Sequence, residues 1–170
     1  MLELVDRHGS EPCARKSVEV RLLSPALLGT VPDLPLTGGC NCGGVRFEID
    51  APLTGAGYCH CTRCQRRTGT AASVQAWPEP GSFRIVEGEE LLAAWEPGDG
   101  WAKLFCSRCG SSVMSRNPAD PDEVSVRLGV FDGDPGVRPE SHQFVAYAAP
   151  WEPLPDDGLP RFPESRNAGA

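Results

Sequence analysis

The chain has 170 residues, with 16 basic and 23 acidic side chains and a formal net charge of -7. That length suits one domain with its own hydrophobic core, and the negative charge argues against polyanionic nucleic acid as a partner. No apolar run approaches the length that spans a bilayer, so we expect a cytoplasmic protein with no membrane partner.

Residues 1–35 show no clear hydrophobic period and contain four prolines. We therefore expect an N-terminal extension, either a flexible arm or an addition foreign to the native protein. The folded domain is expected over residues 36–165, including an extended proline-rich C-terminal segment, and residues 166–170 are expected to form a tail.

From Thr37 onward, short apolar or alternating segments lie between Gly, Pro and Asp positions, a pattern typical of an antiparallel β protein. One short helix is expected over residues 62–68, with Thr62 as its N-cap and Gly69 as its stop. Strands are predicted at residues 45–49, 71–77, 82–86, 91–95, 102–106, 111–115, 124–130 and 143–148.

Two cysteine pairs have the spacing of a structural zinc site. Cys106-x-x-Cys109 is followed by Gly110, and two intervening residues let both thiolates reach one ion. Cys40-x-Cys42 precedes two glycines and can supply the other pair, because residues two apart in extended backbone point the same way. We expect a closed site of four thiolates from these residues.

A third group, Cys59-His60-Cys61-x-x-Cys64, offers three thiolates. Cys59 and Cys61 share one face of an extended segment, and Cys64 can fold back from the first helical turn. Three ligands leave the fourth zinc position open to water or substrate, which is typical of catalytic zinc. Seven cysteines thus divide into one structural and one reactive site, giving two zinc ions per chain.

Several alternatives remain open from the residues alone. A fourth protein ligand from Cys13, His60 or His142 would close the second site, although His60 should face away from its neighbouring cysteines. Spacing does not exclude a shuffled assignment in which Cys64 joins Cys106 and Cys109. A secreted disulfide framework is a further reading, but cysteine is less abundant here than in small disulfide scaffolds.

Arginines surround the third cysteine group at positions 63, 66 and 67. Three arginines on one helical turn cannot all face inward. We expect Arg66 and Arg67 to include a contact for the carboxylates of an acidic thiol substrate, which an acidic protein would otherwise repel.

The cysteine motifs, together with 149-Ala-Pro-Trp-151, resemble in order those of the glutathione-dependent formaldehyde-activating enzyme family, also called centromere-protein-V-like. The resemblance runs from about residue 37 to 163. It implies an all-β, Mss4-like tent of several small antiparallel sheets with zinc-binding knuckles. It also implies that Cys40, Cys42, Cys106 and Cys109 hold structural zinc, while Cys59, Cys61 and Cys64 hold catalytic zinc.

The family's namesake activity implies a carbon-sulfur lyase that joins glutathione, or a similar small thiol, to an aldehyde such as formaldehyde, giving S-(hydroxymethyl)glutathione. A fold and metal site can serve several substrates, so the resemblance does not fix the thiol. The alternative is a zinc-stabilised, Mss4-like binding module without catalysis. Binding of a thiol at the second zinc would distinguish the two hypotheses.

Overall fold

The computed structural model describes residues 32–166, which form a mostly β structure. Predictions for Cys13, for residues 1–31 and for residues 167–170 lie outside this range. The elements are β1 (Leu36–Gly39), β2 (Arg46–Ile49), β3 (Ala56–Cys59), α1 (Thr62–Thr68), β4 (Ser73–Ala76), β5 (Phe83–Glu87), η2 (Glu89–Leu91), β6 (Leu92–Trp95), β7 (Ala102–Cys106), β8 (Ser112–Arg116), β9 (Val124–Arg127), η3 (Leu128–Val130), β10 (Pro139–Gln143), η4 (Val145–Tyr147) and β11 (Arg161–Phe162).

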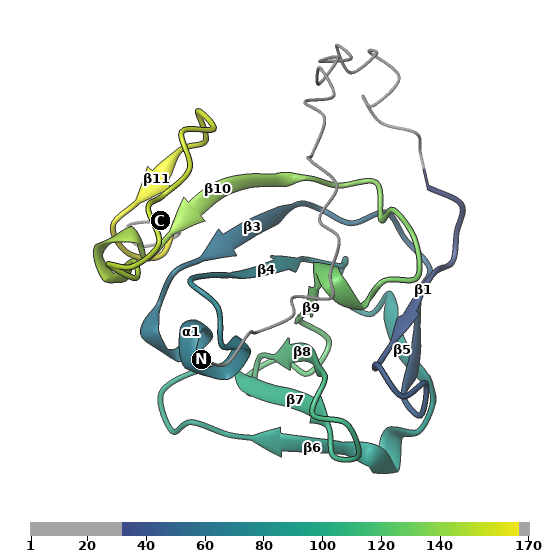
Figure 1. Cartoon of the computed structure of the whole chain (residues 1–170). Coiled ribbons are helices and arrows are strands. Elements are labelled where there is room, and N and C mark those ends of the chain that lie inside the picture. The colour runs from purple at the N-terminus through teal and green to yellow at the C-terminus, as the bar shows by residue number, and fades with distance from the viewer. Residues whose placement is uncertain (1–31, 167–170) are drawn as a thin grey trace, which may run out of the picture.

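The strands form two sheets, one of order β1-β2-β5 and one of order β11-β10-β3-β4-β9-β8-β7-β6. In Figure 1 the larger sheet runs from β11 at the upper left to β6 at the bottom, with β1 and β5 at the right. The expected all-β, largely antiparallel architecture is confirmed. The exception is β10, which pairs in parallel with both β3 and β11.

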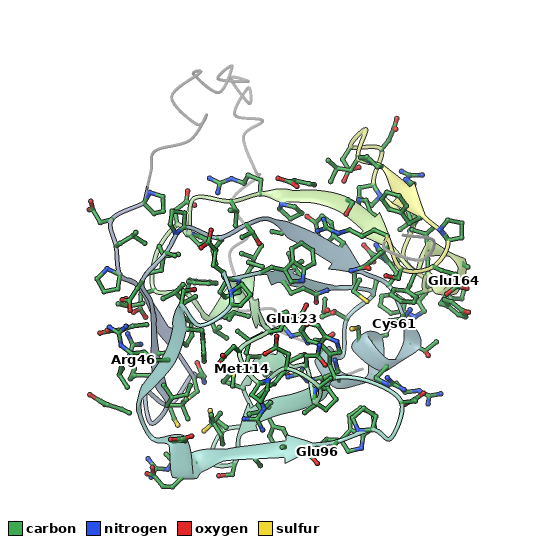
Figure 2. All side chains as sticks on the ribbon, turned by 180° about the vertical axis from the view of Figure 1, so that it is seen from behind. Arg46, Cys61, Glu96, Met114, Glu123 and Glu164 are labelled. Carbon is green, nitrogen blue, oxygen red and sulfur yellow. The ribbon has the colours of Figure 1, made fainter. Side chains whose placement is uncertain are left out.

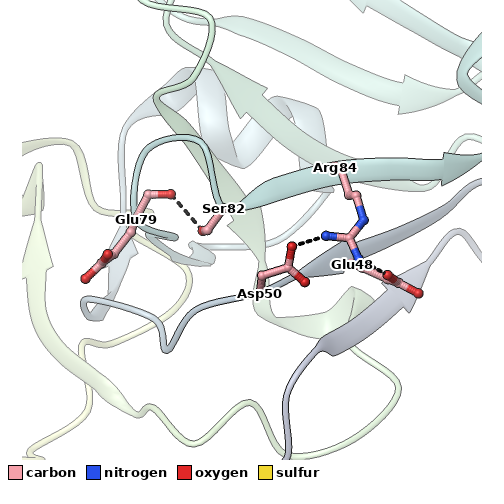
Figure 3. A network of polar contacts seen from close by, with 5 residues as sticks. All are labelled: Glu48, Asp50, Glu79, Ser82 and Arg84. Carbon is pink, nitrogen blue, oxygen red and sulfur yellow. Dashed lines mark hydrogen bonds and ion pairs between the residues drawn. The ribbon is translucent and has the colours of Figure 1, made fainter.

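The smaller sheet has one buried and one polar face, as period-two alternation requires. On β2, Phe47 and Ile49 are fully buried, and the Phe47 ring packs 5.3 Å from that of Phe83. On the polar face, Arg84 of β5 pairs with Glu48 of β2 and with Asp50 just beyond it. Figure 3 shows these two ion pairs crossing between the strands, which stabilise the β2–β5 register.

Helix α1 spans Thr62–Thr68 as expected, but its N-cap is Cys61 rather than Thr62. Cys61 has extended backbone angles, and its sulfur accepts a hydrogen bond from the Cys64 amide at 3.4 Å. The helix ends at Gly69, which has φ 68° and donates its amide to the Gln65 carbonyl. The cap thus uses a cysteine sulfur where a hydroxyl was expected.

Most predicted strands occur within one or two residues of their expected bounds, but the prediction for residues 143–148 is wrong. Phe144 has φ 60°, a left-handed conformation that ends β10 and begins η4. Residues 128–130 form η3 instead of extending β9. β1, β3 and β11 were not predicted, and only Gln143 of β10 fell within a predicted strand. β3 was missed because it contains Gly57 and shows no apolar alternation.

A close backbone contact holds the turn between β1 and β2 against the start of η2. Gly88 has φ 72°, and a Cβ atom there would lie 1.8 Å from the carbonyl oxygen of Gly44. Only glycine permits this approach. The turn carries Cys40 and Cys42, so the contact helps to place this cysteine pair. In residues 32–166 we find no helix long and apolar enough to cross a membrane.

Candidate metal centres and the adjoining cavity

Cys40, Cys42, Cys106 and Cys109 come together with all four sulfur atoms within 4.8 Å of one another. The Cys40 and Cys42 sulfurs lie 3.4 Å apart, and those of Cys42 and Cys106 lie 3.8 Å apart. Zinc-sulfur bonds of about 2.3 Å in a tetrahedron give sulfur separations of about 3.8 Å. The donor set and spacing therefore fit a four-thiolate metal site.

Backbone and hydroxyl groups around this cluster stabilise thiolates. The Val45 amide donates to the Cys40 sulfur at 3.2 Å. The Ser111 hydroxyl lies 3.3 Å from the Cys109 sulfur and accepts from the Asn41 amide at 2.9 Å. Hydrogen bonds with the side chain and backbone of Ser111 are the main cause that lowers the pKa of Cys109 to about 5. Ser111 also links the two cysteine pairs, which are far apart in sequence.

Cys59, Cys61 and Cys64 form the second cluster, with their sulfurs also within 4.8 Å of one another. Cys59 ends β3, Cys61 caps α1, and Cys64 lies in the first turn of the helix. Contacts with the thiols of Cys59 and Cys61 lower the pKa of Cys64 to about 2. Cys64 is thus the sulfur most readily held as a thiolate, the form that binds metal.

Three cationic side chains lie behind the second cluster, and their donors converge on the hydroxyl oxygen of Ser115. Arg127 donates to it at 3.0 Å, Lys103 at 3.2 Å and Arg67 at 3.3 Å. Arg127 is 6% exposed and also donates to Ser73 and Gln75. Within residues 32–166, none of the three cations forms an ion pair with a carboxylate.

Burial without a carboxylate partner affects the pKa values of these cations. Desolvation lowers the pKa of Lys103 to about 8 and that of Arg67 to about 10. Thiolate charge at Cys64 opposes this effect on all three groups. A buried cation needs nearby negative charge, and here the cysteine cluster supplies it.

The second cluster opens into a cavity of about 540 Å³. Lys103 and Arg127 line the cavity along with the three cysteines, and the aromatic rings of Trp77 and Trp101 form part of its wall. Phe144 and Arg166 of the C-terminal segment also line it, and Arg166 lies 4.4 Å above the Trp77 ring. In Figure 2 Cys61 lies beside α1, on the side of the molecule where the C-terminal segment carries Glu164. The cavity combines sulfur ligands, cations and aromatic rings.

The predicted substrate contacts lie elsewhere on α1. Arg66 is exposed, and neither Arg66 nor Arg67 is among the residues that line the cavity. Arg67 instead donates to the carbonyls of Leu104 and Met114, at 3.0 and 3.1 Å, beside an irregularity in the β7–β8 pairing. Arg63 does line the cavity, where it pairs with Asp99 at 2.7 Å.

Neither candidate histidine belongs to the second sulfur cluster. His60 and Tyr58 line a separate cavity of about 520 Å³, whereas Cys59 and Cys61 line the first. The alternation of side chains along extended backbone explains this separation, and His60 faces away from the sulfurs as expected. His60 Nε2 instead lies 2.8 Å from Nδ1 of His142. Among residues 32–166, the second cluster has three residues that could hold a metal ion.

Lys103, Ser115 and Arg127 were not singled out from the sequence. A signal was present, because Lys103 and Arg127 are charged residues inside predicted strands that are otherwise apolar. A charge at a buried strand position points to a functional or paired group. The sequence pattern could not show which residues these charged side chains contact, because Lys103, Ser115 and Arg127 come from different strands.

Comparison with known proteins agrees with this architecture. A family model described as "Glutathione-dependent formaldehyde-activating enzyme" matches residues 35–147. The chain belongs to this family. The match includes all seven cysteines of the two clusters, together with Lys103, Ser115 and Arg127.

Two relatives illustrate the extent of the similarity. A Halomonas elongata protein that carries the name of a glutathione-dependent formaldehyde-activating enzyme is 27% identical over 114 residues, which are 62% of this chain and 71% of that protein. A crystal structure of a Rhodobacter sphaeroides protein aligns with a TM-score of 0.50 at 23% identity, covering 75% of this chain and 99% of that one. The second comparison supports the fold alone.

Proposed function

We propose that this protein catalyses the addition of a small thiol such as glutathione to an aldehyde such as formaldehyde, as a carbon-sulfur lyase acting in the synthetic direction. The observation that carries the proposal is the three-cysteine cluster in the wall of a cavity that buried cations also line. Four thiolates would fill the tetrahedral coordination of zinc and leave no position for substrate, so the chemistry is assigned to the three-cysteine cluster.

Cys59, Cys61 and Cys64 would hold zinc in this proposal, and the donor set of three clustered thiolates fits that metal. When bound, zinc would lower the pKa of an incoming thiol and keep it as the thiolate nucleophile. The cysteines therefore act as ligands and form no covalent bond to the substrate. The family of the chain and the name of its Halomonas relative support glutathione and formaldehyde as the substrate pair.

Residues of the cavity would handle the charge that moves during the reaction. The thiolate sulfur forms a bond to the aldehyde carbon, the carbon-oxygen π bond breaks, and its electron pair goes to oxygen. Lys103 lines the cavity and can donate a hydrogen bond to that oxygen, which takes up the proton that the thiol lost. The addition therefore needs no oxidant or reductant.

Positive charge in the cavity would also orient the thiol substrate. Arg63 and Arg166 lie on its wall and can contact carboxylates of a glutathione-like molecule. Arg66 and Arg67, the contacts expected from the sequence, remain a prediction, although Arg67 is already bonded to two strand carbonyls. Arg63 is the better-placed residue on the same helix.

Cobalt substitution tests the proposal, because cobalt-thiolate charge-transfer absorption rises when a fourth sulfur joins the cluster. We expect glutathione to increase this absorption and S-methylglutathione, which has no free thiol, to leave it unchanged. Cys61→Ser should abolish the response while largely preserving the fold. Exchange NMR with ¹³C-formaldehyde should then show faster formation of S-hydroxymethylglutathione with wild-type protein than without protein. A cobalt spectrum indifferent to all thiols would favour the binding-module alternative.

A further inference from the structure

Three side chains form a continuous hydrogen-bonded chain on the face of β3 opposite the sulfur cluster. His60 Nε2 lies 2.8 Å from His142 Nδ1, and His142 Nε2 lies 2.9 Å from the Asp157 carboxylate. His60 is 5% exposed and His142 is 1% exposed. These hydrogen bonds therefore link the exposed C-terminal segment, through β10, to the residue between Cys59 and Cys61.

Hydrogen bonds and ring stacking fix the side chains of Asp157 and His142 in this series. The Asp157 carboxylate can only accept, so His142 Nε2 donates to it, and this bond lowers the pKa of Asp157. The ring of Tyr58 stacks on that of His142, with centroids 4.6 Å apart and planes inclined by 8°. Both nitrogens of His142 are thus engaged and its ring plane is fixed, which leaves it no freedom to serve as a metal ligand.

The backbone around His60 is held from the same side. The His60 amide donates to the Gln143 carbonyl at 3.0 Å. Gln65 donates to the carbonyls of both His60 and Tyr147, at 2.6 and 2.7 Å. The amide and the ring of His60 are therefore fixed by β10, and Gln65 links its carbonyl to Tyr147.

We propose that Asp157 and His142, acting through His60, position the three-cysteine cluster for metal binding. Cys59 and Cys61 directly flank His60, so a shift of the His60 backbone moves both residues and their sulfurs. This inference rests on the proposed metal site but not on the identity of the substrates. Outer partners that orient metal ligands typically change metal affinity by about 10- to 100-fold when removed.

The first test compares Asp157→Ala with Asp156→Ala, which removes the same charge at the adjacent exposed residue. Metal affinity is measured by chelator competition on the reduced, zinc-loaded full chain, with the four-cysteine site as internal reference. We expect Asp157→Ala to weaken the three-cysteine site about 10-fold and to leave the four-cysteine site unchanged. Asp156→Ala should leave both sites unchanged.

Asp157 also accepts a hydrogen bond from the Leu159 amide at 3.1 Å. A second variant therefore distinguishes loss of the His60–His142–Asp157 hydrogen bonds from loss of this local turn. His142→Phe retains an aromatic ring beside Tyr58 and leaves that turn bond intact, yet removes both ring nitrogens. We expect it to weaken the three-cysteine site at least as much as Asp157→Ala. The three-cysteine site of the double variant should bind metal no more weakly than that of His142→Phe alone, because both substitutions interrupt the same series of hydrogen bonds.

Several outcomes would overturn the inference. One is equal metal loss from both sites, which indicates general destabilisation. Another is an Asp157→Ala protein that matches Asp156→Ala. If wild-type protein retains metal only at the four-cysteine site, the proposed function fails, and hydrogen exchange then tests the positioning separately. In metal-free protein, Asp157→Ala should speed amide exchange in residues 57–66 but not in residues 104–111, and unchanged exchange would count against positioning.

Discussion

The two cysteine clusters differ in how far apart their ligands lie along the chain. The four-cysteine site joins the β1–β2 turn to the β7–β8 turn, and Cys42 and Cys106 are 64 positions apart in the sequence. The three-cysteine site is confined to residues 59–64 and takes its surroundings from β4, β7, β8 and β9. The first cross-links distant segments, whereas the second is a local loop held in place by its neighbours.

The two clusters also differ in the groups that surround and stabilise their sulfurs. Around the four-cysteine site, backbone amides and Ser111 contact the sulfurs, and Cys42 is exposed. Around the three-cysteine site, half-buried Lys103 and Arg67 and buried Arg127 balance the thiolates. Surplus buried charge is costly for stability and typical of a site with a chemical task. This difference supports the proposal that the first cluster is structural and the second reactive.

The largest predicted effect is on folding. Cys106→Ser removes a ligand that links two distant turns, so we expect a loss of about 5 kcal/mol or more, comparable to the whole stability of a domain. Cys64→Ser should lower the free energy of unfolding by only about 1–2 kcal/mol, because the three cysteines of its cluster are already close in sequence. Urea unfolding of zinc-loaded proteins measures both values, and equal losses would contradict this division.

A smaller effect is expected on thiol affinity. Arg63→Ala should weaken glutathione binding to the cobalt-substituted protein roughly three- to five-fold, about 1 kcal/mol, because the lost cation lines the cavity and is partly exposed. Arg66→Ala, on the same helix but exposed, is the matched control and should leave the affinity unchanged. A larger loss with Arg66→Ala would restore the sequence-based assignment.

The smallest effect concerns acid stability on the four-cysteine side. Arg46 of β2 donates to Asp132 at 2.9 Å, and Thr37 of β1 donates to it at 2.6 Å. These bonds, first that from Arg46, lower the pKa of Asp132 to about 2. A depressed carboxyl pKa stabilises the fold above the unfolded value of about 3.9, and this contribution is lost as pH falls towards 2.

Asp132→Asn should therefore be less stable than wild type at neutral pH by roughly 0.5–1 kcal/mol after solvent screening. The difference should shrink between about pH 4 and pH 2, as followed by thermal melting. Asp122→Asn is the control, because Asp122 is exposed and its carboxylate forms no ion pair within the described residues. A pH-independent difference for Asp132→Asn would show that the ion pair is not its source.

Much of the fold could be predicted from local pattern. Alternation identified β2 and β7, because each buries every second residue. The strand predicted at residues 143–148 failed because Phe144 adopts a left-handed conformation that no turn residue announces. The parallel pairing of β10 with β3 could not be predicted, since it joins residues more than eighty positions apart.

The two groups of cysteines were predictable and their surroundings were not. Ligand spacing is a local property, so the two groups of cysteines could be recognised from sequence intervals, and the structure brings together the same groups. Ser115 gathers donors from α1, β7 and β9, and only the sheet order places them together. For the same reason, the link between His60 and His142 had no signal in the sequence.

The parallel β3–β10 pairing also sets an order for maturation during protein synthesis. All four ligands of the first cluster have left the ribosome once residue 109 emerges, so that site can close on a partial chain. The Cys59–Cys64 loop emerges earlier still, yet β10 and Asp157, which hold it, are made only after residue 138. The nascent protein would therefore acquire its cross-link well before its reactive loop is fully held, and a chain truncated after β9 should retain the former without the latter.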